Sequence, residues 1–152
     1  MIDPYATHQR LLVKYMLQTT GPAIELGSGN YSTPILHEIA AAQGRHLTTV
    51  DTNPEWLNKF KIFESDGHSI CLIQSWEEFE PESYGLAFVD HADPPTHPRW
   101  LQVQKLLPTA GVVVIHDTED DLYGYAKLMH LFDVIDEDTR YGTHTRVIRR
   151  KQ

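Results

Sequence analysis

The chain has 152 residues, of which 41 % are apolar and 22 % are charged, and its formal net charge is −8. This length and composition predict one packed globular domain, and no apolar run reaches the roughly 18 residues of a membrane-spanning helix. A surface of this sign repels phosphate backbones, which disfavours nucleic acid as a partner.

Apolar residues recur on one face of residues 5–18, which predicts an N-terminal helix. In chain order, the other predicted elements are a strand (22–26), a helix (33–44), a strand (46–51), a helix from residue 53, strands (69–73 and 86–90), a helix (98–107), a strand (111–116), a helix (121–131) and two strands joined by a turn (132–136 and 143–149). This alternation predicts a mostly parallel sheet covered on both faces.

The domain divides into an N-terminal helix (1–20), a βα core (21–131) and a C-terminal β-hairpin (132–150). We expect these parts to form one minimal domain over residues 1–152, because no linker, repeat or low-complexity segment separates them.

A glycine turn follows the first predicted strand, in the order Gly27-Ser28-Gly29, and a helix start at Ser32 comes next. The glycines allow a tight turn and a close backbone approach to a ligand, and the helix start offers unpaired N–H groups. Asp51 ends the second predicted strand, 24 residues after Gly27. A carboxylate there can accept hydrogen bonds from both hydroxyls of a ribose, which is the layout of a nucleotide-binding βαβ unit.

The residues around the glycines indicate which nucleotide is bound. Dinucleotide folds usually place a third glycine where Ser32 stands. Glu25 lies two residues before the turn, and a carboxylate beside a pyrophosphate is unfavourable. S-adenosylmethionine (SAM) has no phosphate, and its sulfonium and ammonium groups suit a nearby carboxylate.

The run Glu25-x-Gly27-x-Gly29-x-x-Ser32-Thr33, with Asp51 downstream, resembles class I SAM-dependent methyltransferases, and most closely their small-molecule O-methyltransferase-like branch. Residues 88–93 resemble the fourth-strand signature of that branch, and residues 106–118 resemble its L-L-x-P-G-G-x-x-x-x-H-D segment. The resemblance implies a Rossmann-like α/β fold, doubly wound, with a mostly parallel seven-stranded sheet and an antiparallel C-terminal hairpin strand. It covers nearly the whole chain, without an inserted substrate-binding domain.

The resemblance also implies cofactor contacts. The glycine turn would lie against the methionine part of SAM, Glu25 would orient the loop near the ammonium, and Asp51 would hold the ribose. The expected cofactor-binding residues are Glu25, Gly27, Ser28, Gly29, Ser32, Asp51, Thr52, Ser75, Trp76 and Asp90. Two interpretations stay open for Trp76, stacking on the adenine or packing in the core, and for Asn53, a ligand contact or a helix cap.

An oxygen acceptor must lose a proton when it is methylated, and a neutral imidazole or a divalent metal can bring this about. The catalytic candidates are His91, His116 and Asp117, with His97 as a further candidate base. Related metal-dependent enzymes use acids at the ends of the fourth and fifth strands, which implies a divalent metal at Asp90 and Asp117. Thr118 stands where those enzymes have another Asp or Asn, and an imidazole from His116 or His91 would favour transition metals.

The function expected from this resemblance is SAM-dependent methyl transfer to a small-molecule acceptor at a hydroxyl oxygen. An inactive SAM-binding partner subunit, an NAD-linked oxidoreductase, and methylation of RNA or protein remain alternatives. Tyr5 and His8 of the N-terminal helix would cover the pocket, and Arg99 or Trp100 would contact the acceptor or pack below it. A homodimer would close an open pocket.

A cytoplasmic location is expected for two reasons. Residues 1–4 lack the basic start and apolar stretch of a secretion signal. Cys71 is the one cysteine, so no disulfide can form within the chain.

Overall fold

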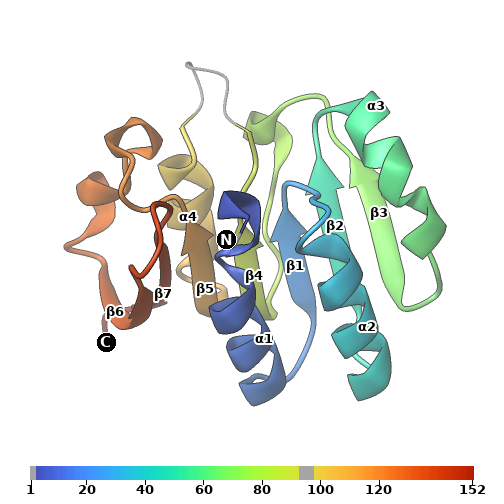
Figure 1. Cartoon of the computed structure of the whole chain (residues 1–152), viewed down its shortest axis with the longest axis horizontal. Coiled ribbons are helices and arrows are strands. Elements are labelled where there is room, and N and C mark those ends of the chain that lie inside the picture. Colours follow the sequence, from blue (N-terminus) through green and yellow to red (C-terminus); the bar gives the residue numbers. More distant parts are fainter. Residues whose placement is uncertain (1–2, 93–97) are drawn as a thin grey trace.

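The computed structural model describes residues 3–92 and 98–152. One seven-stranded sheet runs through it, in the order β3-β2-β1-β4-β5-β7-β6 (Figure 1). The strands are β1 (Ala23–Leu26), β2 (Leu47–Asp51), β3 (His68–Leu72), β4 (Tyr84–Val89), β5 (Ala110–His116), β6 (Phe132–Asp138) and β7 (Thr145–Arg150). The first five strands are parallel, and β7 pairs antiparallel with both β5 and β6. The predicted sheet, including its hairpin, is confirmed.

Helices cover both faces of this sheet. The α-helices are α1 (Gln9–Gln18), α2 (Thr33–Gln43), α3 (Pro54–Leu57) and α4 (Trp100–Leu106), and the 3-10 helices are η1 (Pro4–Ala6), η2 (Asn58–Phe63), η3 (Trp76–Glu78), η4 (Asp121–Tyr123) and η5 (Tyr125–Leu128). Figure 1 shows α1 and α2 in front of the sheet. Among the described residues, no helix has the length and apolar character needed to cross a membrane.

The core lies in two layers because successive strand residues point to opposite faces of the sheet. In β4, Leu86 and Phe88 pack with the apolar side chains of α1 and α2, whereas Ala87 and Val89 pack with those of α4 and η5. The strands are therefore buried on both sides, which explains their nearly continuous apolar runs.

The helix predicted over residues 121–131 is wrong. Two short 3-10 helices, η4 and η5, take its place, and Gly124 stands between them with a φ of 71°. A left-handed residue cannot continue an α-helix. A Cβ at Gly124 would lie 2.4 Å from Trp100 Cδ1, so this turn depends on glycine and lets the segment pack closely on α4.

The predicted helix from residue 53 begins as expected, because the Asn53 side chain accepts a hydrogen bond from the Trp56 amide at 3.0 Å. The capping interpretation of Asn53 is thus confirmed. The α-helix ends after one turn and continues as the 3-10 helix η2.

The order of the strands fixes where a ligand can lie. The chain moves outward from β1 to β3 on one side, then returns and moves outward from β4 on the other. In open parallel sheets this switch point opens a crevice beyond the carboxyl ends of the strands. Asp51, Asp90 and His116 all stand at that edge, at or just after the ends of β2, β4 and β5.

Candidate functional site

A cavity of about 770 Å³ opens at the switch point between β1 and β4. Segments from both halves of the sheet and from the N-terminus surround it. Its lining residues are Pro4, Tyr5, His8, Gly27, Ser28, Gly29, Asn30, Tyr31, Ser32, Asp51, Asn53, Trp56, Asp90, Ala92, Arg99, His116, Asp117, Tyr123 and Thr143. Six of the ten predicted cofactor residues therefore line one cavity. They are Gly27, Ser28, Gly29, Ser32, Asp51 and Asp90.

The glycine turn lies against the start of the segment after β4. Gly27 has a φ of 92°, and a Cβ there would lie 2.4 Å from the Cα of His91. The Gly27 amide donates to the carbonyl of Val50 at 2.9 Å, which ties the turn to β2. Only glycine can adopt this positive φ and also fit the short distance to His91. The turn therefore presents its backbone, without a side chain at Gly27, at the cavity wall.

Asp51 joins the end of β2 to this turn. Its Oδ2 atom accepts hydrogen bonds from the backbone N–H of Ser28 at 2.9 Å and from the Ser28 hydroxyl at 2.7 Å. Its Oδ1 atom accepts from the amides of Thr52 at 2.8 Å and Asn53 at 3.0 Å. Four donors thus hold the carboxylate at the cavity wall, and the contact from Thr52 is made by its backbone.

Glu25 lies beneath the turn and does not line the cavity. Its side chain is fully buried, and its Oε2 atom accepts hydrogen bonds from the hydroxyls of Thr33 at 2.9 Å and Thr49 at 2.7 Å. Thr33 Oγ1 in turn accepts from the Gly29 amide at 2.9 Å. Burial raises the pKa of Glu25 to about 7, although the hydroxyl donors oppose the rise. The carboxyl group therefore orients the glycine turn through Thr33.

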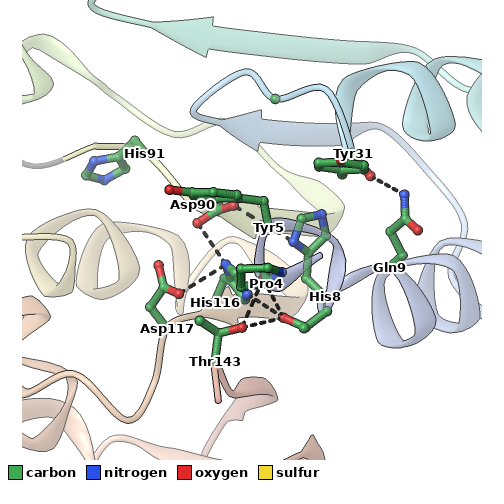
Figure 2. A network of polar contacts seen from close by, with 12 residues as sticks. Pro4, Tyr5, His8, Gln9, Tyr31, Asp90, His91, His116, Asp117 and Thr143 are labelled. Carbon is green, nitrogen blue, oxygen red and sulfur yellow. Dashed lines mark hydrogen bonds and ion pairs between the residues drawn. The ribbon is translucent and has the colours of Figure 1, made fainter. Parts of the chain in front are cut away.

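A cluster of five ionisable side chains faces the turn across the cavity, and we call it the polar cluster. Its members are His8, Asp90, Arg99, His116 and Asp117. Figure 2 shows His8, Asp90, His116 and Asp117 gathered together, with His91 lying apart from them. They come from the segment before α1, the end of β4, the segment before α4 and the end of β5, so the tertiary fold brings them together.

His116 is at the centre of the polar cluster. Its Nδ1 atom lies 3.1 Å from Asp90 Oδ1 and 3.4 Å from Asp117 Oδ1, and its Nε2 atom lies 2.9 Å from Thr7 Oγ1. Burial disfavours the protonated ring, but the hydrogen bond and charge of Asp90 and the charge of Asp117 outweigh it and raise the pKa of His116. The Nδ1 atom is therefore placed to donate to the carboxylate oxygens.

Arg99 occupies the space between the two carboxylates. Its Nη2 atom lies 3.3 Å from Asp90 Oδ1 and its Nη1 atom 3.1 Å from Asp117 Oδ2, while the guanidinium stacks 3.8 Å from the ring centre of Tyr123. The group is 3 % exposed. Arg99 thus bridges Asp90 and Asp117, and the metal site that the sequence predicts at this pair stays a prediction.

Several predicted residues lie away from the cavity. Trp76 is buried in the core and stacks on His91, with ring centres 4.0 Å apart, and neither lines the cavity. The Ser75 hydroxyl accepts from the Glu77 amide at 3.3 Å at the start of η3. The structure therefore does not place His91 as a base or Trp76 as an adenine contact, and His97 lies outside the described residues.

The cavity also contains residues that the sequence analysis did not single out. They include Trp56, Tyr31, Tyr123 and Thr143. Trp56 Nε1 donates to the carbonyl of Ser28 at 2.7 Å, so its ring stands next to the glycine turn. The sequence could have indicated that Trp56 lies near the site, because it stands three residues after Asn53, the residue that caps the helix. Thr143 reaches the cavity from the β6–β7 turn, which no local pattern indicates. Tyr5 and His8 line the cavity as predicted for the N-terminal segment.

No family model matches the sequence, and no match was found among curated proteins. Solved structures do match. An O-methyltransferase from Bacillus cereus in complex with SAH (S-adenosylhomocysteine) has a TM-score of 0.67 at 14 % identity, covering 99 % of this chain and 83 % of its own. The SAH-bound methyltransferase PaMTH1 of Podospora anserina has a TM-score of 0.66 at 15 % identity, covering 95 % and 78 %.

The 23S rRNA methyltransferase ErmE matches with a TM-score of 0.60 at 14 % identity, covering 94 % of this chain and 68 % of its own. Likenesses at these identities concern the fold. They confirm the Rossmann-like methyltransferase fold that the sequence pattern predicts, and they include both an O-methyltransferase and an rRNA methyltransferase.

Proposed function

We propose that this protein is a SAM-dependent methyltransferase that transfers the methyl group to a hydroxyl oxygen of a small molecule. One observation carries the proposal: a single cavity joins the glycine turn and Asp51 on one wall to the polar cluster on the other. The first wall suits an adenosyl cofactor, and the second suits an acceptor that must lose a proton.

The charges of the lining residues suit SAM. Three carboxylates face the cavity, from Asp51, Asp90 and Asp117, and among the described lining residues Arg99 alone is permanently cationic. Since Arg99 forms ion pairs with two of these carboxylates, it is not placed to neutralise a pyrophosphate. A sulfonium and an ammonium gain from such a lining, whereas a dinucleotide phosphate is repelled. This distinction favours SAM over NAD.

We assign the ribose hydroxyls to Asp51. A carboxylate has about four acceptor sites, and here the Ser28 amide, the Ser28 hydroxyl and two further amides use them. The backbone amides are fixed by the turn, but the Ser28 hydroxyl can rotate. We therefore expect the ribose to replace that hydroxyl at Asp51, and we assign the aromatic contact with adenine to Trp56, because it lines the cavity.

Bound SAM supplies the methyl group and a neutral thioether as leaving group, so the chain must position the acceptor and take up its proton. We assign these tasks to the polar cluster. His116 Nδ1 lies 3.1 Å from Asp90 Oδ1 and its other nitrogen is held by Thr7, so we assign the uptake of the proton to the second carboxylate oxygen of Asp90. The pair is thus oriented toward the cavity before an acceptor arrives.

The net charge of −8 supports a small acceptor over RNA, because an RNA substrate needs a basic surface. A small molecule needs only to enter the cavity. We assign contacts with such an acceptor to the side chains of Tyr5, Tyr31 and Tyr123, which line the cavity.

Isothermal titration calorimetry with S-adenosylhomocysteine tests this proposal, with NADH titrated into a parallel sample. We expect saturable binding of S-adenosylhomocysteine only, and its loss in Asp51→Ala. A folded protein that binds NADH and no S-adenosylhomocysteine would contradict it. Methyl transfer from radiolabelled SAM to a panel of small hydroxylated molecules then separates an active enzyme from an inactive binding subunit.

A further inference from the structure

Three side chains of the polar cluster are spaced as metal ligands. One potential ligand atom from each of His8, Asp90 and His116 lies within 4.8 Å of the other two. We propose that these three residues bind a transition-metal ion such as Zn²⁺ or Fe²⁺. The proposed function supplies the chemical role of this ion, but the site itself is argued from the geometry alone.

The ligand atoms are nearly at coordination spacing. Asp90 Oδ1 lies 3.1 Å from His116 Nδ1, and Asp90 Oδ2 lies 3.9 Å from His8 Nδ1. Bonds of about 2.0 to 2.2 Å to one ion place neighbouring ligand atoms roughly 3 to 3.5 Å apart. The three ligand atoms, within 4.8 Å of one another, would have to move closer together to bind one ion. The three residues come from separate elements, the segment before α1, the end of β4 and the end of β5.

His8 provides an independent indication of a bound ion. Its side chain is 2 % exposed, neither ring nitrogen makes a hydrogen bond of good geometry within the described part of the chain, and the backbone of Tyr31 is a nearby polar group. Poorly satisfied nitrogens in a buried ring are costly, and in native structures such groups point to a bound water or ion. Because Nδ1 faces Asp90 Oδ2 at a distance too long for a hydrogen bond, a cation between the two atoms would satisfy both.

The second ring nitrogen of His116 is hydrogen-bonded, as is usual for a histidine that binds a metal ion. Its Nε2 atom is held by Thr7 Oγ1 at 2.9 Å, and Thr7 Oγ1 also contacts the Pro4 carbonyl at 3.1 Å and Thr143 Oγ1 at 2.7 Å. Hydrogen bonds of this kind fix the orientation of ligating imidazoles. The Nδ1 atom is left to face the cluster, and a bound metal ion would replace a proton on that atom.

The donor set selects the kind of metal. Two imidazoles and one carboxylate suit Zn²⁺ or Fe²⁺, whereas Mg²⁺ and Ca²⁺ prefer oxygen ligands. This site differs from the pair of strand-end acids, Asp90 and Asp117, because Arg99 bridges that pair. It depends instead on His8, a residue of the N-terminal segment.

The charge balance suits an ionised acceptor. Asp90, Asp117 and Arg99 together carry one net negative charge when ionised, and a divalent ion would change this to one net positive charge. Three protein ligands leave coordination positions open toward the cavity. An acceptor hydroxyl bound there would have a lowered pKa and would lose its proton more readily.

Metal binding to untagged protein, first stripped with EDTA, tests the proposal. The probe is Co²⁺, followed by its visible absorption bands, with Zn²⁺ and Mg²⁺ as competitors. We expect one Co²⁺ per chain, displaced by Zn²⁺ and not by Mg²⁺, and an affinity at least about tenfold lower in His8→Ala and in His116→Ala. The matched control is His37→Ala, since His37 also contacts another histidine, His68, with 3.0 Å between Nδ1 atoms; it should bind Co²⁺ as the unmodified protein does.

Wild-type affinity in His8→Ala, no stoichiometric Co²⁺ binding, or equal competition by Mg²⁺ would each overturn the proposal. If His8→Ala does not fold, Co²⁺ binding is measured in His8→Gln instead. In addition, the NMR signals of the His8 imidazole nitrogens are followed in the unmodified protein, because ligation shifts those signals on addition of Zn²⁺. Titrating S-adenosylhomocysteine into the metal-free protein separates the two proposals. Cobalt binding without S-adenosylhomocysteine binding would leave the metal site standing and remove the methyltransferase function.

Discussion

The carboxylate of Asp51 accepts two hydrogen bonds from Ser28, one from its backbone N–H at 2.9 Å and one from its hydroxyl at 2.7 Å. This contact joins the last residue of β2 to the turn that follows the neighbouring parallel strand β1. The ends of the two strands are therefore held in a fixed relation before a ligand binds, which lowers the cost of ordering the site.

The two partners of this contact should respond differently to substitution. Asp51→Ala removes the acceptor of four hydrogen bonds and should abolish binding of S-adenosylhomocysteine. Ser28→Ala removes only the hydroxyl that the ribose is expected to replace, so its binding constant should stay within about threefold of the unmodified protein. Calorimetric titration of both variants checks this. A loss as large in Ser28→Ala as in Asp51→Ala would show that the ribose does not replace the hydroxyl.

The glycine turn should tolerate no side chain at Gly27. Gly27 and Gly44 both have positive φ values, 92° and 63°, but a Cβ would meet backbone 2.4 Å away at Gly27 and nothing within 4 Å at Gly44. Gly44→Ala should therefore cost only about 1 to 2 kcal/mol, the left-handed backbone term, and Gly27→Ala distinctly more. Urea unfolding of the two variants measures the difference. Equal losses would mean that the close approach of the segment after β4 does not matter.

Glu25 should make the stability depend on pH. Burial raises its pKa from 4.5 to about 7, so the folded protein binds this proton more tightly than the unfolded chain. The stabilisation is complete below about pH 4.5, is lost as the pH rises to about 7, and amounts to roughly 3 kcal/mol at about 1.4 kcal/mol per pKa unit.

The Glu25→Gln variant isolates this effect, because other groups titrate in the same range. We predict that the free energy of unfolding of the unmodified protein falls relative to Glu25→Gln between pH 5 and pH 7.5, measured by urea unfolding at each pH. A difference between the two proteins that does not change with pH would show that Glu25 has an ordinary pKa.

Arg99 should be essential for the stability of the polar cluster. It contacts both Asp90 and Asp117 and also donates to the carbonyls of His91 at 2.6 Å and His116 at 3.3 Å. Arg99→Ala leaves two partly buried acids without their shared, buried cation and should lower the free energy of unfolding by about 3 kcal/mol. Arg99→Lys keeps the charge without the planar fork, so an intermediate loss is expected. A loss below about 1 kcal/mol in Arg99→Ala would contradict this role.

The sequence predicted the sheet because each of its strands carries a strong local signal. The run Val112–Ile115 at the centre of β5 is an example. The glycine turn and Asp51 were also predictable, since their spacing along the chain reflects one βαβ unit. The helix over residues 121–131 was predicted wrongly because the left-handed conformation of Gly124 depends on close packing against Trp100, which is a tertiary contact.

The opposite wall of the site was only partly predictable. His116 and Asp90 could be placed at strand ends, but Thr7 contacts His116 across 109 positions of sequence. The bridge by Arg99 and the stacking of Trp76 on His91 are likewise contacts between separate elements. No local pattern indicates which of several polar residues at one sheet edge meet.

A crystal structure with S-adenosylhomocysteine tests the central claim most directly. The account predicts the ribose hydroxyls on Asp51, the glycine turn against the homocysteine part, and the sulfur facing the polar cluster. A ligand bound elsewhere, or a nucleotide whose phosphate rests on the glycine turn, would contradict it.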